Sequence, residues 1–198
     1  VVAPIDSEFD TMADVAEWAK EHPDIPVTAA VGTANGTVDL TFQAISQQTG
    51  INMSIVPHDG GAAIMTDILS GSYMIGGGHP AEVYTYVESP QMKVLGIASA
   101  ERDQSFPDVP TLQEQGIDFV SYGSIKGIAV PVGTPQEIKE YYEDIFAQIC
   151  EDAEFQETLL NMAQPAMYMD TEEFTKYFEE ANADNKNVIE DLGLAYYQ

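Results

Sequence analysis

The first hundred residues alternate between short apolar runs and longer stretches in which apolar residues recur every three or four positions. Four of the apolar runs have the composition of β-strands: residues 25–31, 51–56, 72–75 and 92–99. Four of the periodic stretches have the spacing of amphipathic helices: residues 11–21, 38–50, 62–71 and 81–89. Strands that alternate with helices predict an α/β domain with a largely parallel sheet.

Capping residues mark several of the predicted helix ends. Thr11 and Asp14 stand three positions apart before the first helix, in a variant of the capping box. Gly50 is expected to end the second helix. Nearer the C-terminus, residues 134–137 form a further capping box, with Pro135 at the first helical position. We therefore expect a helix to begin there.

The pattern changes after Gly116. Residues 117–133 are rich in β-branched residues and glycine, as in an extended chain, and three strongly helical segments follow. The last of these, residues 171–192, places aromatic and aliphatic residues on one face that should bury against a sheet. Only residues 125–130 and 166–169 are available to pair beneath the helices. The C-terminal portion is therefore expected to be part of a domain whose other strands are missing.

The net charge of the chain excludes several classes of binding partner. The chain of 198 residues has 33 acidic and 7 basic side chains, a formal net charge of −26, so we expect it to bind no nucleic acid and no anionic lipid. Cys150 is the single cysteine, which excludes an internal disulfide and a cysteine-rich metal site. No apolar stretch is long enough to span a bilayer, and the first residues do not resemble a signal peptide. Because the sequence begins with valine, we expect a processed or trimmed product.

Residues 56–71, VPHDGGAAIMTDILSG, place four candidate residues between a strand and a helix: His58, Asp59, Gly60 and Gly61. A metal site would need further ligands at matched spacing, and the three histidines of the chain belong to no paired motif. A phosphate loop would need a lysine after the glycines. Two interpretations stay open, a bare turn or a helix start whose unpaired backbone N–H groups bind an anion.

Two further loops of small residues follow strands. Residues 32–37, GTANGT, offer hydroxyl and amide groups for hydrogen bonds to a small polar ligand, or they cap the next helix. Residues 75–81, IGGGHPA, match the spacing of a dinucleotide fingerprint. In an open α/β sheet the loops after the strand carboxyl ends converge on one crevice, so the three loops predict a single site. No nucleophile elbow, S-x-x-K or C-x-x-C motif accompanies them.

Three motifs follow one another along the chain: VPHDGG, then ASAERDQSFPDVPTLQEQG, then VPVGTPQE. In this order and at this spacing they resemble the substrate-binding proteins of tripartite tricarboxylate transporters, the TctC or Bug family. The second motif is the most specific, and several of its residues match the family form: Ser99, Arg102, Pro107, Asp108, Val109, Pro110, Thr111, Glu114 and Gly116. The resemblance spans essentially the whole chain.

The resemblance implies a two-lobed fold like that of type II periplasmic binding proteins. Residues 5–121 would form lobe two, whereas residues 1–4 and 122–198 would supply hinge strands and the C-terminal helical part of an incomplete lobe one. The implied function is capture of a small carboxylate or amino-acid-like solute between the lobes, with no enzymatic activity and no cofactor. Delivery to membrane permease subunits would follow. The implied location is extracytoplasmic, in the periplasm or anchored by lipid at the cell surface.

Carried over by position, the resemblance assigns ligand contacts to a set of loop residues: Thr33, Asn35, Thr37, His58, Asp59, Gly60, Gly61, Gly78, His79, Pro80, Ser121 and Ser124. The two serines would lie at the hinge. Asp59 stands where the family usually has a lysine, and Asp39 stands near the place of a usual histidine. An acid at position 59 repels an anion unless it turns to solvent, so we expect a ligand that is zwitterionic or less charged than citrate.

Two alternatives stay open at this point. The first is an α/β enzyme that binds a nucleotide through residues 76–81. The second is a chain that lacks half of its binding site, binds nothing alone and associates with another copy of itself or with another segment.

Overall fold

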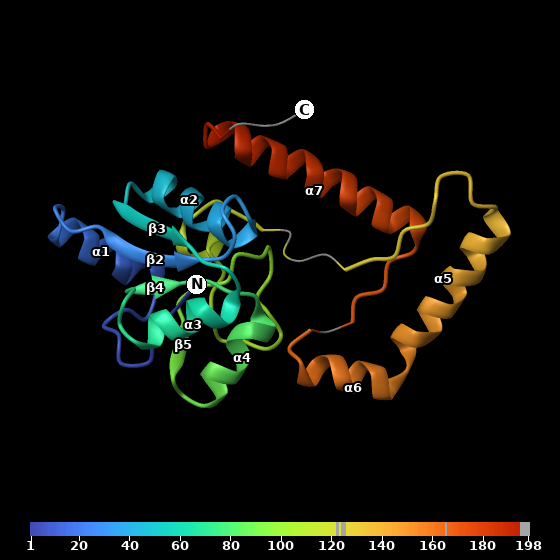
Figure 1. Ribbon diagram of the computed structural model, residues 1–198, viewed down its shortest axis with the longest axis horizontal. Coiled ribbons are helices and arrows are strands. Elements are labelled where there is room, and N and C mark those ends of the chain that lie inside the picture. The colour runs from blue at the N-terminus through green and yellow to red at the C-terminus, as the bar shows by residue number, and fades with distance from the viewer. Residues whose placement is uncertain (122, 124–125, 165, 195–198) are drawn as a thin grey trace. The chain divides into compact units, whose positions relative to one another are not determined.

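The computed structural model describes residues 1–121, 123, 126–164 and 166–194. The chain divides into two compact units (Figure 1). The first comprises Val1–Ser124 together with Val188–Gln198, and the second comprises Ile125–Asn187. How these units correspond to the two predicted lobes stays a prediction.

The first unit contains one five-stranded sheet in the order β3-β2-β4-β1-β5. Its strands are short: β1 (Val2–Pro4), β2 (Val27–Val31), β3 (Met53–Pro57), β4 (Ile75–Gly76) and β5 (Met92–Val94). β2 pairs in parallel with β3 and β4, whereas β1 is antiparallel to both β4 and β5. The α/β prediction is confirmed, and the sheet is mixed because β1 runs against its neighbours.

Helices cover both faces of this sheet (Figure 1). The four helices are α1 (Met12–Glu21), α2 (Thr37–Thr49), α3 (Gly61–Leu69) and α4 (Pro80–Glu88). β2 shows why two layers of helix form, because its side chains alternate between the faces. Val27, Ala29 and Val31 belong to the buried cluster that includes α1 and α2, whereas Ala30 belongs to the cluster that includes α3 and α4.

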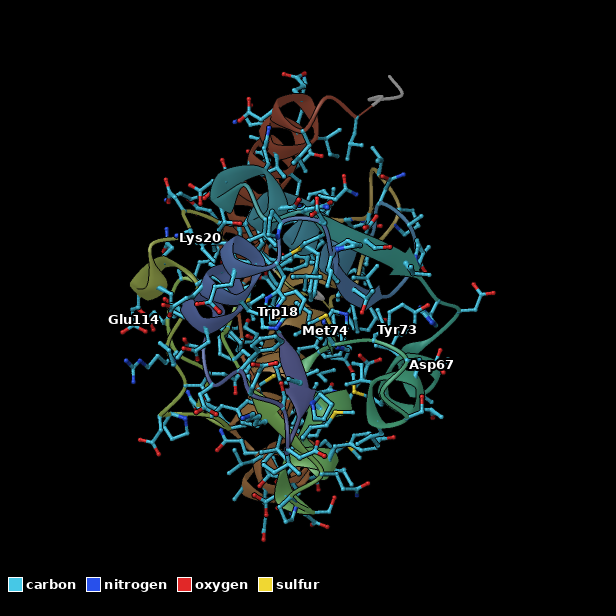
Figure 2. The ribbon with its side chains drawn as sticks, turned by 90° about the vertical axis from the view of Figure 1, so that its left-hand side faces the viewer. Trp18, Lys20, Asp67, Tyr73, Met74 and Glu114 are labelled. Atoms are coloured by element: carbon cyan, nitrogen blue, oxygen red, sulfur yellow. The ribbon has the colours of Figure 1, made fainter. Side chains whose placement is uncertain are left out.

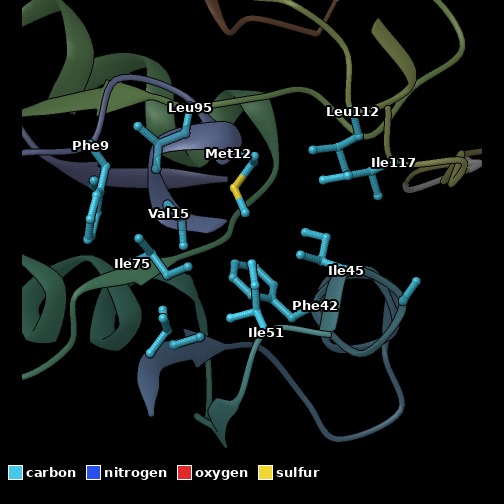
Figure 3. Close-up of a cluster of buried hydrophobic side chains, with 14 of the residues drawn as sticks. Phe9, Met12, Val15, Phe42, Ile45, Ile51, Ile75, Leu95, Leu112 and Ile117 are labelled. Atoms are coloured by element: carbon cyan, nitrogen blue, oxygen red, sulfur yellow. The ribbon is translucent and has the colours of Figure 1, made fainter. Parts of the chain in front are cut away.

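The first of these clusters is the larger one (Figure 3). Phe42 and Ile45 of α2 and Met12 and Val15 of α1 are buried there beside Ile75 of the sheet. Burial of apolar side chains is the main favourable term in folding. This cluster therefore stabilises the sheet and the two helices that pack against it.

Two predicted helix ends are confirmed. Asp14 N–H donates to the Thr11 hydroxyl at 3.2 Å, and Thr11 N–H donates to the Asp14 carboxylate at 2.7 Å, which completes the capping box of α1. The Asp10 N–H, which donates to the Asp14 carboxylate at 2.9 Å, lowers the pKa of Asp14 most, and hydrogen bonds from the Thr11 hydroxyl and N–H lower it further. At the end of α2, Gly50 adopts a left-handed conformation with φ 72°, which costs glycine little.

The long motif on which the family resemblance depends, residues 98–116, forms the loop after β5, and an ion pair holds this loop together. The Arg102 guanidinium meets the Glu114 carboxylate at 2.9 and 3.0 Å. Glu114 also accepts the Thr111 N–H at 2.7 Å, at the start of the 3-10 turn η1 (Gln113–Gln115). The carboxylate of Glu114 keeps the pKa of Arg102 raised, and Arg102 in turn lowers the pKa of Glu114. These motif residues therefore shape the loop.

The second unit consists of α5 (Gln136–Glu151), α6 (Ala153–Asn161) and most of α7 (Thr171–Asp191). The prediction of three helices is confirmed. The predicted capping box of α5 is wrong, because the helix begins after Pro135 and the Thr134 hydroxyl donates to the Pro131 carbonyl at 2.7 Å instead. The described parts of residues 125–130 and 166–169 form no strand, and the assignment of this portion to a domain with missing strands stays a prediction.

The end of α7 belongs to the first unit. Val188 packs against the larger buried cluster, and the Gln47 side chain donates to the Asp191 carbonyl at 2.9 Å. Among the helices that the structure describes, none combines the length and the apolar character needed to cross a bilayer.

Candidate functional site

The predicted ligand loops leave the same edge of the sheet. Val31 at the end of β2 is in register with Pro57 at the end of β3, and Ala30 is in register with Gly76 at the end of β4. Each of these strands leads through a short loop directly into α2, α3 or α4. The structure therefore brings most of the predicted contacts together at one edge: Thr33, Asn35, Thr37, His58, Asp59, Gly60, Gly61, Gly78, His79 and Pro80.

The loop after β2 is held by the first turn of α2. Asn35 has a left-handed backbone with φ 59°, and its N–H donates to the Asp39 carboxylate at 2.6 Å. The Gln43 amide donates to the same carboxylate oxygen at 3.0 Å. Asp39 is 5% exposed and lies in the first turn of a helix, where the helix dipole favours a negative charge. The carboxylate of Asp39 thus already occupies a position that an anionic ligand could otherwise use.

The imidazole of His58 is engaged inside the unit. Its Nδ1 lies 2.9 Å from the Val56 carbonyl oxygen, and its Nε2 lies 2.9 Å from Asp67 Oδ2 on α3. Tyr73 meets the ring edge-on at a centroid distance of 5.2 Å. Figure 2 labels these two partners of the ring, Asp67 and Tyr73. The side chain of His58 is 13% exposed. The ring therefore links Val56 of β3 to Asp67 of α3. We call this pair of contacts the His58 brace.

The start of α3 is the least occupied of the three helix starts. Gly60 is the N-cap with φ 98°, a conformation that strains any other residue, and no side chain caps the helix. The first N–H groups of a helix have no partner within the helix and carry partial positive charge. Asp59 is exposed. The Gly60 N–H donates to the His58 carbonyl at 3.2 Å, so the Gly61 N–H and those that follow it in the first turn of α3 are the donors best suited to a carboxylate.

Glu82 was not singled out from the sequence, yet it lies at the centre of this edge. Its carboxylate accepts the His79 N–H at 2.9 Å and completes the cap of α4. The same carboxylate lies so close to Gly61 that a Cβ there would stand 2.5 Å from Glu82 Oε1. The signal in the sequence is the acid three positions after His79, with Pro80 at the first helical position.

Packing accounts for the glycines that resemble a dinucleotide fingerprint. A Cβ at Gly77 would stand 2.6 Å from Val38 and 2.8 Å from Phe42, both on α2. A Cβ at Gly78 would stand 2.8 Å from Met65 of α3. The loop is therefore made of glycine because two helices approach it closely. The carboxylate of Glu82 beside it would repel a diphosphate.

Of the two predicted hinge serines, the structure describes Ser121, which is tied to the loop after β5. Ser121 N–H donates to the Ala98 carbonyl at 2.5 Å, and the Ser121 hydroxyl accepts the Gly123 N–H at 3.1 Å. Ser124 lies outside the described residues. Their role at a hinge stays a prediction.

The described residues form neither a metal site nor a second site suited to binding a carboxylate ligand. Within the described ranges, no three side chains of His, Cys, Asp or Glu lie close enough together to hold a metal ion. The second unit contains a hollow of about 560 Å³ between α5 and α7. Four acids, Glu143, Asp170, Glu172 and Glu179, line it together with Lys176, so its charge is wrong for an anion.

Comparison with protein families decides the class of the molecule. Residues 1–194 match the model of the TctC family, described as the tripartite tricarboxylate transporter family receptor. The chain belongs to the TctC family. TctC proteins are solute receptors and not enzymes, so the alternative of a nucleotide-binding enzyme is set aside.

Individual relatives agree with this family. A curated protein of Cupriavidus necator, the "UPF0065 protein in gbd 5'region", is 29% identical over 198 residues, and the chain spans 60% of its length. The crystal structure of a TctC solute binding protein from Polaromonas, without ligand, superposes with a TM-score of 0.80 at 27% identity, covering 96% of this chain and 65% of that one. This TctC chain therefore spans less than two thirds of the length of such relatives.

A more distant structure shows the same fold. A protein of R. palustris with adipate superposes with a TM-score of 0.79 at 18% identity and covers 98% of this chain. Together with the Polaromonas protein, it confirms the predicted periplasmic-binding-protein-like fold.

Proposed function

We propose that this TctC chain is the ligand-binding part of an extracytoplasmic receptor that captures a small carboxylate and delivers it to membrane permease subunits. The observation that carries the proposal is the convergence of three strand ends and three helix starts at one edge of the sheet. In open α/β sheets this edge is where ligands bind. Two structural neighbours from R. palustris hold adipate and malate, and a third neighbour is the periplasmic binding protein BugD.

In this proposal the ligand carboxylate lies at the start of α3. The N–H of Gly61 and those that follow it in the first turn of α3 donate to its oxygens beside Gly60, and the partial positive charge of the helix start offsets its negative charge. The hydroxyl groups of Thr33 and Thr37 and the Asn35 amide supply further polar contacts from the loop after β2. His58 and Asp67 hold α3 in position but do not themselves contact the ligand.

Acidic side chains near the proposed site limit the negative charge that the ligand can carry. Asp39 and Glu82 already satisfy N–H groups at the starts of α2 and α4. A tricarboxylate would bring its additional charges close to these two acids and to Asp59. We therefore propose a ligand with one or two carboxylates, or a zwitterion such as an amino acid, in preference to citrate.

Titration calorimetry with malate, adipate, glutamate and citrate tests the proposed ligand class. We expect malate, adipate or glutamate to bind more tightly than citrate, and the reverse order would contradict the proposal. The position of the site is tested by ¹⁵N NMR, because glycine amides are well resolved. Ligand should shift the amides of Gly60 and Gly61, while Gly50 and Gly116, which end other helical segments, serve as controls.

A further inference from the structure

Asn35 differs from the other asparagines of the chain in its surroundings. It is exposed in the turn after β2, and within the described part of the chain its side-chain amide has no hydrogen-bond partner. Four of the other five asparagines lie in helices: Asn161 in α6, and Asn182, Asn185 and Asn187 in α7. The fifth, Asn52, precedes a methionine. Among the six asparagines, all of which the structure describes, only Asn35 lies in a turn and precedes a glycine.

An asparagine that precedes a glycine can lose its side-chain amide with water as the only other reactant. The backbone nitrogen of Gly36 gives up its proton and attacks Cγ of Asn35, which closes a five-membered succinimide ring. The bond from Cγ to Nδ2 breaks, and the nitrogen takes up a proton and leaves as ammonia. Water then opens the ring at either of its carbonyl carbons, so the product is an aspartate or an isoaspartate at position 35. A side chain on the following residue hinders ring closure, and glycine has none.

Two hydrogen bonds hold the turn that contains the reacting atoms. The Gly36 N–H donates to the Thr33 carbonyl at 2.8 Å, and the Asn35 N–H donates to the Asp39 carboxylate at 2.6 Å. The attacking nitrogen is therefore engaged while the turn is closed, and the reaction requires the turn to open. Exposed loops open far more readily than the buried core, because few buried contacts hold them. The fold thus slows the reaction at Asn35 without preventing it.

We propose that Asn35 is a deamidation site whose conversion alters the edge of the sheet where the predicted ligand loops meet. Both products place a new negative charge in the loop after β2, close to the Asp39 carboxylate. Isoaspartate also carries the main chain through the side-chain carbon, which lengthens the connection between β2 and α2. Conversion should therefore weaken the binding of a carboxylate. This consequence rests on the proposed function, whereas the modification itself does not.

Incubation of the chain in mildly alkaline buffer, followed by peptide mass spectrometry, tests the modification. We expect exchange of the amide for a carboxyl group to be faster at position 35 than at position 52 by roughly tenfold or more, because glycine leaves ring closure unhindered. Asn52 is the matched control within the same chain, since it is also exposed and lies outside the helices and strands. Asp39→Ala should accelerate the reaction at position 35 several-fold, because it releases the Asn35 N–H and loosens the turn.

Two results would overturn the assignment of the site. The first is an equal rate at positions 35 and 52. The second is conversion of Asn35 in urea but not in the folded chain, because the closed turn would then protect it completely.

The consequence for the site is measured by calorimetry with malate. Asn35→Asp reproduces the added charge and should weaken malate binding several-fold. Asn52→Asp adds the same charge just before the start of β3, at the opposite edge of the sheet, and should leave the affinity unchanged. Equal affinities of the two variants would contradict the effect of conversion on the site. Failure of the unmodified chain to bind malate counts against the proposed function alone, because mass spectrometry detects the modification without a ligand.

Discussion

His58 Nε2 and Asp67 Oδ2 lie 2.9 Å apart and join the end of β3 to the middle of α3. The other ring nitrogen lies 2.9 Å from the Val56 carbonyl oxygen. The ring therefore links β3 to α3 and helps to position the start of α3, where the Gly61 N–H is a backbone donor of the proposed site.

Replacement of His58 by asparagine should loosen this brace. Asparagine can still donate to the Val56 carbonyl but is too short to reach Asp67. We expect a loss of about 1 kcal/mol in the free energy of unfolding, measured with urea, and weaker binding of malate, measured by calorimetry. Asp67→Asn should have a smaller effect, because Asp67 is 40% exposed and solvent screens the pair. Unchanged malate affinity in His58→Asn would show that the brace does not position the site.

Glu82→Gln should strengthen the binding of anions. The glutamine side-chain oxygen can still accept the His79 N–H, so the cap of α4 is kept while the negative charge beside Gly61 is removed. We expect malate affinity to rise several-fold, because a like charge within a few ångströms of the ligand is lost. Glu88→Gln, at the other end of α4, is the control and should not change the affinity. Equal affinities for wild type and Glu82→Gln would place the ligand away from this edge.

Gly77→Ala should destabilise the first unit. The added methyl group would stand 2.6 Å from Val38 and 2.8 Å from Phe42, and Phe42 is fully buried. We expect a loss of about 1–3 kcal/mol in the free energy of unfolding, as for other overpacked cores. Gly32→Ala provides the comparison, since nothing lies within 4 Å of its added methyl group, and its melting temperature should match wild type. Similar melting temperatures for both variants would contradict the packing seen around Gly77.

The two threonines predicted to cap helices should differ on mutation. Thr11→Ala removes the hydroxyl that accepts the Asp14 N–H and should cost about 1 kcal/mol. Thr134→Ala removes a hydroxyl that bonds to Pro131 and caps no helix, so we expect no loss of α5 helicity by circular dichroism. A loss of helicity in Thr134→Ala would show that the Thr134 side chain does cap α5, as the sequence predicts.

Local patterns in the sequence determined the order of strands and helices in the first unit. The capping box at Thr11 and the glycine stop at Gly50 act over a few residues, so each could be recognised without knowledge of the fold. The same holds for the strand-to-helix loops, whose convergence follows from the parallel arrangement of β3, β2 and β4. The failure at Thr134 has a local cause as well, because the hydroxyl had a competing acceptor in the preceding turn.

Contacts between residues far apart in the chain were decided by the tertiary structure alone. Glu82 lies against Gly61 because α3 and α4 start at the same edge of the sheet, after the two strands that flank β2, and the glycines near position 77 are needed because α2 approaches that loop. His58 became a brace when Asp67 came within hydrogen-bonding distance. Sequence periodicity predicts which side of a helix or strand is apolar, but it contains no information about which neighbour that side meets. Those distances determine how much negative charge surrounds the proposed site and hence which carboxylates it can accept.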